Sequence, residues 1–146
     1  MSMYQYTESG LKNIWLVNGY TVKQTPYGES VSIQDVRGLH RLIGSIIAKR
    51  PRLAGPELRF LRKEMEMSQK TLADFVGTSE QTVSLWERRG SVPKAADRLI
   101  KLAYLETINK DGNVKIKQII QELNELDAKA FQKLELKRGN VWREAA

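Results

Sequence analysis

The side chains best suited to recognising another molecule lie in residues 69–89, "QKTLADFVGTSEQTVSLWERR". This segment places amides, hydroxyls, carboxylates and guanidinium groups around a single glycine, Gly77. In the major groove of DNA, a glutamine such as Gln81 can make two hydrogen bonds to adenine, and a carboxylate such as Glu80 can accept one from cytosine. These residue types favour contact with the base edges of a duplex, provided that the backbone presents them together.

The apolar residues of the segment indicate how the backbone would do so. Helical spacing runs up to Gly77, which can take the left-handed conformation that ends a helix, and then resumes on a different face. Ser68 is a suitable N-cap for the first helix, and Ala73 is small enough to let two helices cross closely. The side chains that we expect to fill the wedge between the helices are Leu72, Val76, Val83 and Trp86. This spacing is typical of a helix-turn-helix.

Most side chains around the start of the second helix are too polar for a core; they are Ser79, Glu80, Gln81, Thr82, Ser84 and Leu85. The start of such a helix can meet base edges, while hydroxyls and backbone N–H groups meet phosphates. Gln69 begins the preceding helix and can help to clamp a phosphate. Arg88, Arg89 and Lys94 fit phosphates at the edge of the groove. In the alternative interpretation, the segment is a three-helix packing motif with a solvated polar and cationic face.

The charge distribution favours the first interpretation. The 146-residue chain has a formal net charge of +7, and residues 49–101 carry 12 Lys and Arg against 7 Asp and Glu, which is +5 of that total. Such an excess indicates an anionic partner, with nucleic acid the first candidate and a membrane surface the second. No apolar run approaches the ~18 residues of a membrane span, and the N-terminus lacks the features of a signal peptide. We therefore expect a soluble, intracellular protein.

Residue types also limit the chemistry. The chain has no cysteine, which excludes disulfides, thiolate metal sites and cysteine nucleophiles. His40 is the only histidine, and we expect it to be an ordinary packed or surface side chain of a helix. There is no Gly-rich phosphate loop and no paired-carboxylate motif. We expect no metal, no cofactor and no enzymatic activity.

Strand composition dominates residues 4–34. "NIWLV" and "YTVKQT" flank Asn18 and Gly19, the strongest short signal for a β-hairpin. Residues 26–30 then break the chain before "VSI", so a three-stranded antiparallel meander is predicted. From Ser32 the spacing becomes helical, with a capping box formed by Ser32 and Asp35, and this helix should end by Lys49. Residues 50–55 contain Pro51 and Gly55 and are followed by Pro56, and we interpret them as a linker.

Helices are predicted to start at Pro56 and near Pro93, and a last one near Val114. The apolar stripe of that last helix contains Ile116, Ile119, Ile120, Leu123 and Leu126. It either forms a dimer surface or folds back onto its own domain, and the N-terminal module could provide the pairing instead. The tail, residues 133–146, is either a short hairpin around "RGN" or a frayed end. The predicted division is 1–52, 53–108 and 109–146.

The segment "LRKEMEMSQKTLADFVGTSEQTVSLWERRGSVP" resembles the Xre family, the lambda-repressor/Cro-type helix-turn-helix of bacterial and phage regulators. The resemblance covers about residues 55–106. It implies a mostly α protein with a five-helix DNA-binding domain that docks as a homodimer on a palindromic operator. By position in the motif, the implied base readers are Glu80, Gln81, Ser84 and Leu85. The implied backbone contacts are Gln69, Lys70, Ser79, Thr82 and Arg88, and Glu87 is implied to pair with Arg62.

Two features depart from the family pattern. "WERRG" has one residue more before its glycine than the usual motif, so the following loop would meet the phosphates differently. Leu85 is apolar where some relatives have a polar reader; it would pack on a thymine methyl group or face a partner helix.

The N-terminal half, with "GLKNIWLVNGY" and "YGESVSIQDVRGLHRLIGSIIAK", is similar to the arrangement in MqsA-type antitoxins, whose zinc-binding cysteines this chain lacks. Two functions follow as hypotheses. One is a cytoplasmic repressor of a bacterium or phage, acting at the nucleoid, which could be the autoregulating antitoxin of its operon. In the other, the N-terminal module primarily neutralises a toxin, Trp15, Tyr20 and Tyr27 are partly exposed, and DNA binding is secondary. The alternative for these aromatic residues is that they form the core of the N-terminal module itself.

Overall fold

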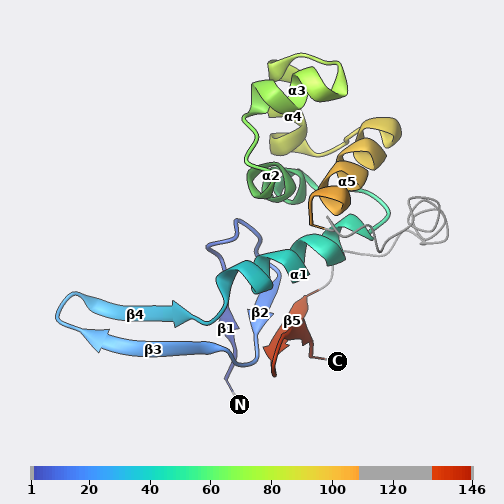
Figure 1. Ribbon diagram of the computed structural model, residues 1–146. Coiled ribbons are helices and arrows are strands. Elements are labelled where there is room, and N and C mark those ends of the chain that lie inside the picture. Colours follow the sequence, from blue (N-terminus) through green and yellow to red (C-terminus); the bar gives the residue numbers. More distant parts are fainter. Residues whose placement is uncertain (1, 109–132, 146) are drawn as a thin grey trace. The chain divides into compact units, whose positions relative to one another are not determined.

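The computed structural model describes residues 2–108 and 133–145 (Figure 1). The chain divides into two compact units, Met1–Leu42 with Phe131–Ala146, and Ile43–Ala130. The division falls inside helix α1 (Val36–Ala48). The described residues form five helices and small strands, mostly antiparallel, which confirms the predicted fold class. None of the helices in these residues combines the length and apolar character that a membrane crossing requires.

The first unit is built on a four-stranded sheet in the order β1-β2-β5-β6. Its strands are β1 (Tyr4–Gln5), β2 (Ile14–Leu16), β5 (Leu134–Arg138) and β6 (Trp142–Glu144). β2 and β5 run parallel, with Ile14 beside Leu134 and Leu16 beside Leu136, and the other pairs are antiparallel. Alternate residues on β2 and at the start of β5 are buried, because side chains of a strand point to opposite faces in turn. The sheet therefore joins the two ends of the chain.

The predicted hairpin at Asn18 and Gly19 is wrong. β3 (Tyr20–Thr25) pairs instead with β4 (Gly28–Ile33) in a separate two-stranded sheet, turning at residues 26–27, so the predicted break over residues 26–30 is also too long. Asn18 Oδ1 accepts a hydrogen bond of 2.6 Å from the backbone N–H of Arg138, which lies 120 residues away in sequence. A Cβ at Gly19 would lie 2.4 Å from the Trp142 ring. Asn18 thus binds the backbone of β5, and Gly19 leaves room for the Trp142 ring of β6.

Helix α1 begins one turn later than the predicted capping box. Ser32 lies in β4, and Asp35 is the capping residue: its Oδ1 accepts from the N–H of Gly38 at 3.1 Å. The backbone carbonyl of Asp35 accepts from the N–H of Leu39 at 3.0 Å. The helix ends at Ala48, as the prolines beyond Lys49 predicted.

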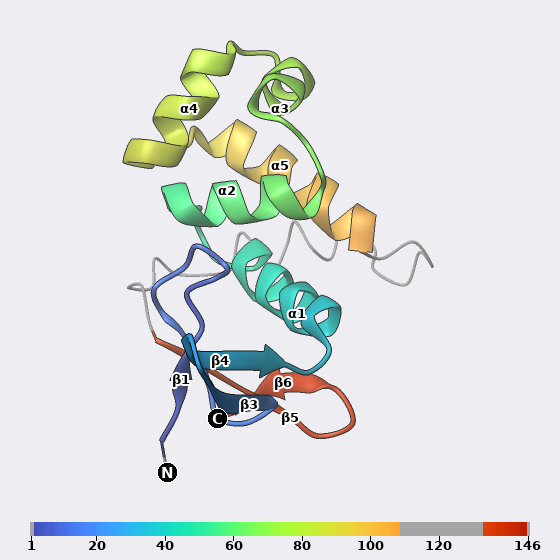
Figure 2. The same cartoon turned by 90° about the vertical axis from the view of Figure 1, so that its left-hand side faces the viewer.

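The second unit contains the end of α1 and four further helices: α2 (Gly55–Glu64), α3 (Gln69–Val76), α4 (Glu80–Arg89) and α5 (Lys94–Ile108) (Figure 2). Their buried faces meet at Leu58, Leu61, Leu72, Val83 and Ile100, each at 0 % exposure. The Ser68 hydroxyl accepts from the N–H of Thr71 at 3.0 Å, which confirms the predicted N-cap of α3. The expected helix around Val114 lies outside the described residues.

The segment between α1 and α2, interpreted from sequence as a linker, is held by buried charges of α5. Asp97 and Lys101 form a fully buried ion pair of 2.5 Å. Lys101 Nζ donates to the carbonyls of Arg50 at 2.5 Å and Pro51 at 3.1 Å, and Asp97 Oδ2 accepts from the N–H of Leu53 at 2.6 Å. Burial lowers the pKa of Lys101, and Asp97 opposes that shift. These contacts make the segment part of the helical core.

The tail forms a hairpin, one of the two predicted alternatives. β5 and β6 pair antiparallel around residues 139–141. Because β5 also pairs with β2, the hairpin is part of the N-terminal sheet, whereas the sequence had grouped the tail with residues 109–132. This pairing between the two ends of the chain is a non-local contact that leaves no local pattern in the sequence.

Candidate nucleic-acid interface

Helices α3 and α4 meet across a three-residue turn, residues 77–79. Gly77 has φ 89° and ψ 37°, and its N–H donates to the carbonyl of Ala73 at 2.8 Å. A Cβ at Gly77 would meet no atom within 4 Å, so the left-handed backbone, rather than space, calls for glycine here. Ser79 then caps α4: its hydroxyl accepts from the N–H of Thr82 at 3.2 Å. Residues 69–89 are therefore two separate helices, as predicted.

The predicted apolar wedge is present between these helices. Leu72 and Val83 are fully buried, and Ala73 is 1 % exposed, as expected for a small residue where two helices cross. Val76 and Trp86 are partly buried. The wedge holds α4 against α3 and leaves the opposite side of α4 to solvent.

A close approach that the sequence analysis missed brings α2 against the end of α4. A Cβ at Gly55, the first residue of α2, would lie 2.2 Å from the backbone carbonyl oxygen of Glu87 and 3.0 Å from that of Trp86. The only sequence signal was a glycine directly before Pro56, where the helix was predicted to begin. Only a residue without a side chain allows this contact between the two helices.

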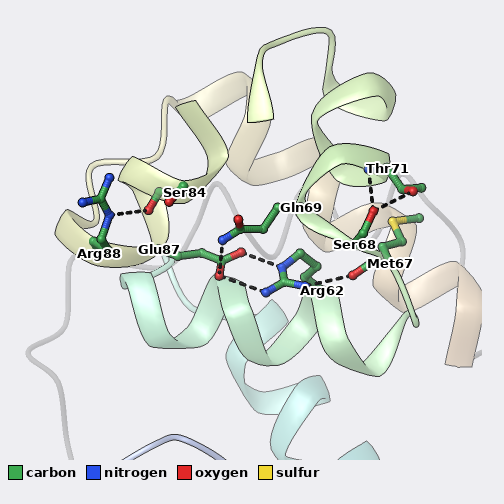
Figure 3. Close-up of polar contacts among 8 residues, drawn as sticks. All are labelled: Arg62, Met67, Ser68, Gln69, Thr71, Ser84, Glu87 and Arg88. Carbon is green, nitrogen blue, oxygen red and sulfur yellow. Dashed lines mark hydrogen bonds and ion pairs between the residues drawn. The ribbon is translucent and has the colours of Figure 1, made fainter. Parts of the chain in front are cut away.

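The ion pair expected between Arg62 of α2 and Glu87 of α4 is present (Figure 3). Arg62 Nε lies 2.6 Å from Glu87 Oε2, and Arg62 Nη2 lies 3.1 Å from Oε1. The side chains are only 11 % and 6 % exposed. Arg62 also donates to the carbonyl of Met67 at 2.9 Å, directly before the N-cap of α3, and Gln69 Nε2 donates to Glu87 Oε1 at 3.2 Å. The bidentate Arg62–Glu87 ion pair connects α2 with the end of α4, and the hydrogen bonds of both residues extend the connection to the start of α3.

The expected base readers lie on the solvent side of α4. Glu80 and Gln81 are exposed, Leu85 is 38 % exposed, and Ser84 is partly exposed. Gln81 and Ser84 are therefore accessible, which contact with a duplex requires. The apolar side chain of Leu85 stands among them as an exposed hydrophobic group.

The residues expected to contact phosphates are all at least partly exposed. Lys70, Ser79, Arg88, Arg89 and Lys94 are exposed, and Gln69 and Thr82 are partly exposed. Three of these residues also have structural roles. Ser79 caps α4 and bonds Thr82 Oγ1 at 2.9 Å, and Gln69 is bound to Glu87. The backbone N–H groups at the starts of α3 and α4 add positive ends of helix dipoles to this surface.

The additional residue in "WERRG" is accommodated by the helix and by the turn after it. α4 continues through Arg89, and the N–H of Gly90 donates to the carbonyl of Trp86 at 2.7 Å. Gly90 and Ser91 both have positive φ, 79° and 62°, after which Val92 is buried at 1 % exposure. The Arg52 side chain donates to the carbonyl of Val92 and holds the end of this turn.

The other residues considered for chemistry lie elsewhere. His40 Nε2 is 2.7 Å from the Tyr6 hydroxyl in the N-terminal unit, where it is a partly buried packing residue. Within residues 2–108 and 133–145, no group of three or more His, Asp or Glu side chains is placed to hold a metal ion.

The helix-turn-helix family model matches residues 58–103, from α2 into α5 and about a third of the chain. No match was found among curated proteins or among solved structures. The matched segment contains the Gly77 turn, the buried wedge and the Arg62–Glu87 pair. The chain therefore contains a helix-turn-helix domain of the Xre, lambda-repressor-like type, and is a DNA-binding regulator.

Proposed function

We propose that the protein is a sequence-specific transcriptional repressor. Its α4 would enter the major groove, with Glu80, Gln81, Ser84 and Leu85 facing base edges. The observation that carries this proposal is the exposure of this polar face on a helix whose other side is locked into the core by Val83 and by the Arg62–Glu87 pair. A helix that recognises a base sequence needs a backbone held in a fixed position and polar side chains that are free to contact the bases.

Each proposed reader has a distinct chemical role. The amide of Gln81 suits adenine, which offers a donor and an acceptor side by side, and the Glu80 carboxylate accepts from the amino group of cytosine. Ser84 can donate or accept, and Leu85 can pack on a thymine methyl group. Because each good base contact discriminates by about 1–3 kcal/mol, four such residues suffice for a specific half-site.

Phosphate contacts would supply most of the affinity. Lys70, Arg88, Arg89 and Lys94 are exposed around α4 and would displace counterions from the backbone. Gln69 Nε2 carries two hydrogens, so its bond to Glu87 leaves one to donate to a phosphate. Ser79 and Thr82 add hydroxyls at the start of α4.

A homodimer on a palindromic operator fits this architecture. One helix-turn-helix covers a single half-site, and two copies related by a two-fold axis read half-sites about 34 Å apart. Such a repressor would act in the cytoplasm, on the nucleoid or on phage DNA. Footprinting of the DNA upstream of its own gene tests the proposal: a protected palindrome, and weak binding to a shuffled duplex at the same salt, are expected. Equal affinity for both duplexes contradicts it.

A second function, neutralisation of a partner toxin, is favoured by the exposed hairpin β3–β4. Tyr27 at its turn is fully exposed, Val22 is 46 % exposed, and Tyr20 is partly exposed. Trp15, on β2 of the other sheet, is also partly exposed. The apolar side of α1 is not available to a partner in the same way, because Leu39, Ile43 and Ile47 are buried. In this case the protein would be an autoregulating antitoxin. Co-purification with the product of a neighbouring gene, lost on Tyr27→Ser, is the expected result; retention by the variant contradicts this role for the hairpin.

A further inference from the structure

The four-stranded sheet of the N-terminal unit has one buried face and one open face. Ile14, Leu16 and Leu136 are at 0 % exposure. The residues that alternate with them, Trp15 on β2 and Glu135 and Lys137 on β5, point to the other side. Trp15 and Lys137 are partly exposed and Glu135 is exposed.

The strand register places cations on the same face of the sheet as the indole ring of Trp15. Trp15 lies beside Glu135, and Lys137 is paired with Arg143 of β6. Lys133 Nζ lies 4.6 Å from the centroid of the Trp15 ring, within the range of a cation–π interaction. We call these residues, Trp15, Lys133, Glu135, Lys137 and Arg143, the Trp15 face. It carries three cations and one carboxylate and so attracts an anionic ligand.

Trp15 is partly exposed and the Lys133 ammonium lies over its ring, so a ligand that stacks on the indole must displace Lys133. The combination of this indole with cations narrows the class of that ligand. An acidic peptide would need the cations alone, whereas a nucleic acid strand offers phosphates to the cations and a base to the indole ring. A duplex keeps its bases stacked inside and shows only their edges, so stacking on Trp15 requires an unpaired base. We propose that the Trp15 face binds single-stranded nucleic acid, as a second site independent of the helix-turn-helix.

The test uses the full chain carrying Gln81→Ala and Arg88→Ala, which weaken the proposed duplex contacts, and a fluorescein-labelled oligothymidine read by anisotropy. Trp15→Ala should lower its affinity about tenfold, within the range measured for loss of one base–aromatic stack, and Trp15→Phe should restore most of it. Lys137→Gln with Arg143→Gln should flatten the salt dependence. Lys23→Gln, on exposed strand β3, is the matched control and should change nothing.

Two results would overturn the proposal. One is an oligothymidine affinity that Trp15→Ala leaves unchanged in a variant with the thermal midpoint of its parent. The other is polyglutamate binding as tightly as oligothymidine, which would mark a plain cationic surface. Neither result bears on duplex reading: failure of that function would appear as operator binding that is insensitive to Gln81→Ala, whatever happens at Trp15.

Discussion

Gln69 at the start of α3 donates a hydrogen bond of 3.2 Å to Glu87 near the end of α4. The same carboxylate holds Arg62 of α2 by two contacts. The residue proposed to clamp a phosphate is thus tied to the proposed recognition helix through one carboxylate (Figure 3). Because Arg62 and Glu87 are mostly buried, the position of Gln69 relative to the proposed base readers of α4 is fixed within the folded domain.

Removing one member of the Arg62–Glu87 pair should destabilise the protein more than replacing both members by apolar residues. We expect Glu87→Ala to lower the free energy of unfolding by about 3–5 kcal/mol, since it leaves the Arg62 guanidinium without its carboxylate in a mostly buried site. The double variant Arg62→Met with Glu87→Met removes both charges and should lose clearly less. Urea unfolding of the three proteins measures this. Equal losses in the single and double variants would show that desolvated charge is not the cause.

Substitutions of a base-contacting residue and of a phosphate-contacting residue should have different effects on DNA binding. Gln81→Ala should relax preference at one base pair by about 1–3 kcal/mol and leave binding to random DNA unchanged. Arg88→Ala should weaken all sequences alike and reduce the salt slope by about 0.9. Fluorescence anisotropy with operator and shuffled duplexes over a salt series distinguishes the two. If both variants change operator and random DNA equally, Gln81 is not a base reader.

The contact of Gly55 with α4 predicts intolerance of the smallest side chain. Gly55→Ala places a Cβ against the backbone carbonyl of Glu87, which cannot rotate away, and should destabilise the protein by about 1–3 kcal/mol. Gly139→Ala is the matched control, because a Cβ there meets no atom within 4 Å. Thermal unfolding of both variants gives the comparison. A Gly55→Ala midpoint equal to that of the control would refute the close approach.

Burial of Glu57 predicts a pH-dependent cost. Its side chain is 3 % exposed, and burial raises its pKa above the ordinary value of 4.5. The hydrogen bond from the backbone N–H of Ala54 and the positive charges of Arg50 and Lys101 oppose this rise, whereas the negative charge of Asp97 adds to it. The pKa of Glu57 is higher in the folded protein than in the unfolded chain. The stability that the protonated Glu57 side chain contributes is therefore fully present below pH 4.5 and is lost as the pH rises through the folded pKa. Glu57→Gln keeps an acceptor for Ala54 and removes this loss.

We therefore expect Glu57→Gln to gain stability relative to the unmodified protein as pH rises from 4.5 to neutral. Urea unfolding at both ends of this range measures the difference. Glu106→Gln, at an exposed position of α5, controls for the loss of one negative charge. A difference that stays constant with pH would contradict the predicted cost of the buried carboxylate.

The sequence by itself determined the helix-turn-helix, because the signals for it are local. Ser68 and Ser79 cap helices through hydrogen bonds to residues three positions on, and Gly77 ends α3 through its own backbone conformation. The alternation of apolar and polar residues on α4 separated its buried side from the exposed side that carries Glu80 and Gln81. The pairing of Arg62 with Glu87 was implied by the family resemblance, and it is present in the structure.

Only the tertiary structure decided how the segments outside this motif pair. Asn18 and Gly19 have the local chemistry of a hairpin turn, but Arg138 and Trp142 engage them from the other end of the chain. Residues 50–53 have linker composition, but Asp97 and Lys101 bind their backbone in the core. A turn motif or a proline indicates which local conformations the backbone can adopt. Strand pairing and the pairing of buried charges depend instead on contacts between residues far apart in sequence, and a local sequence pattern does not contain that information.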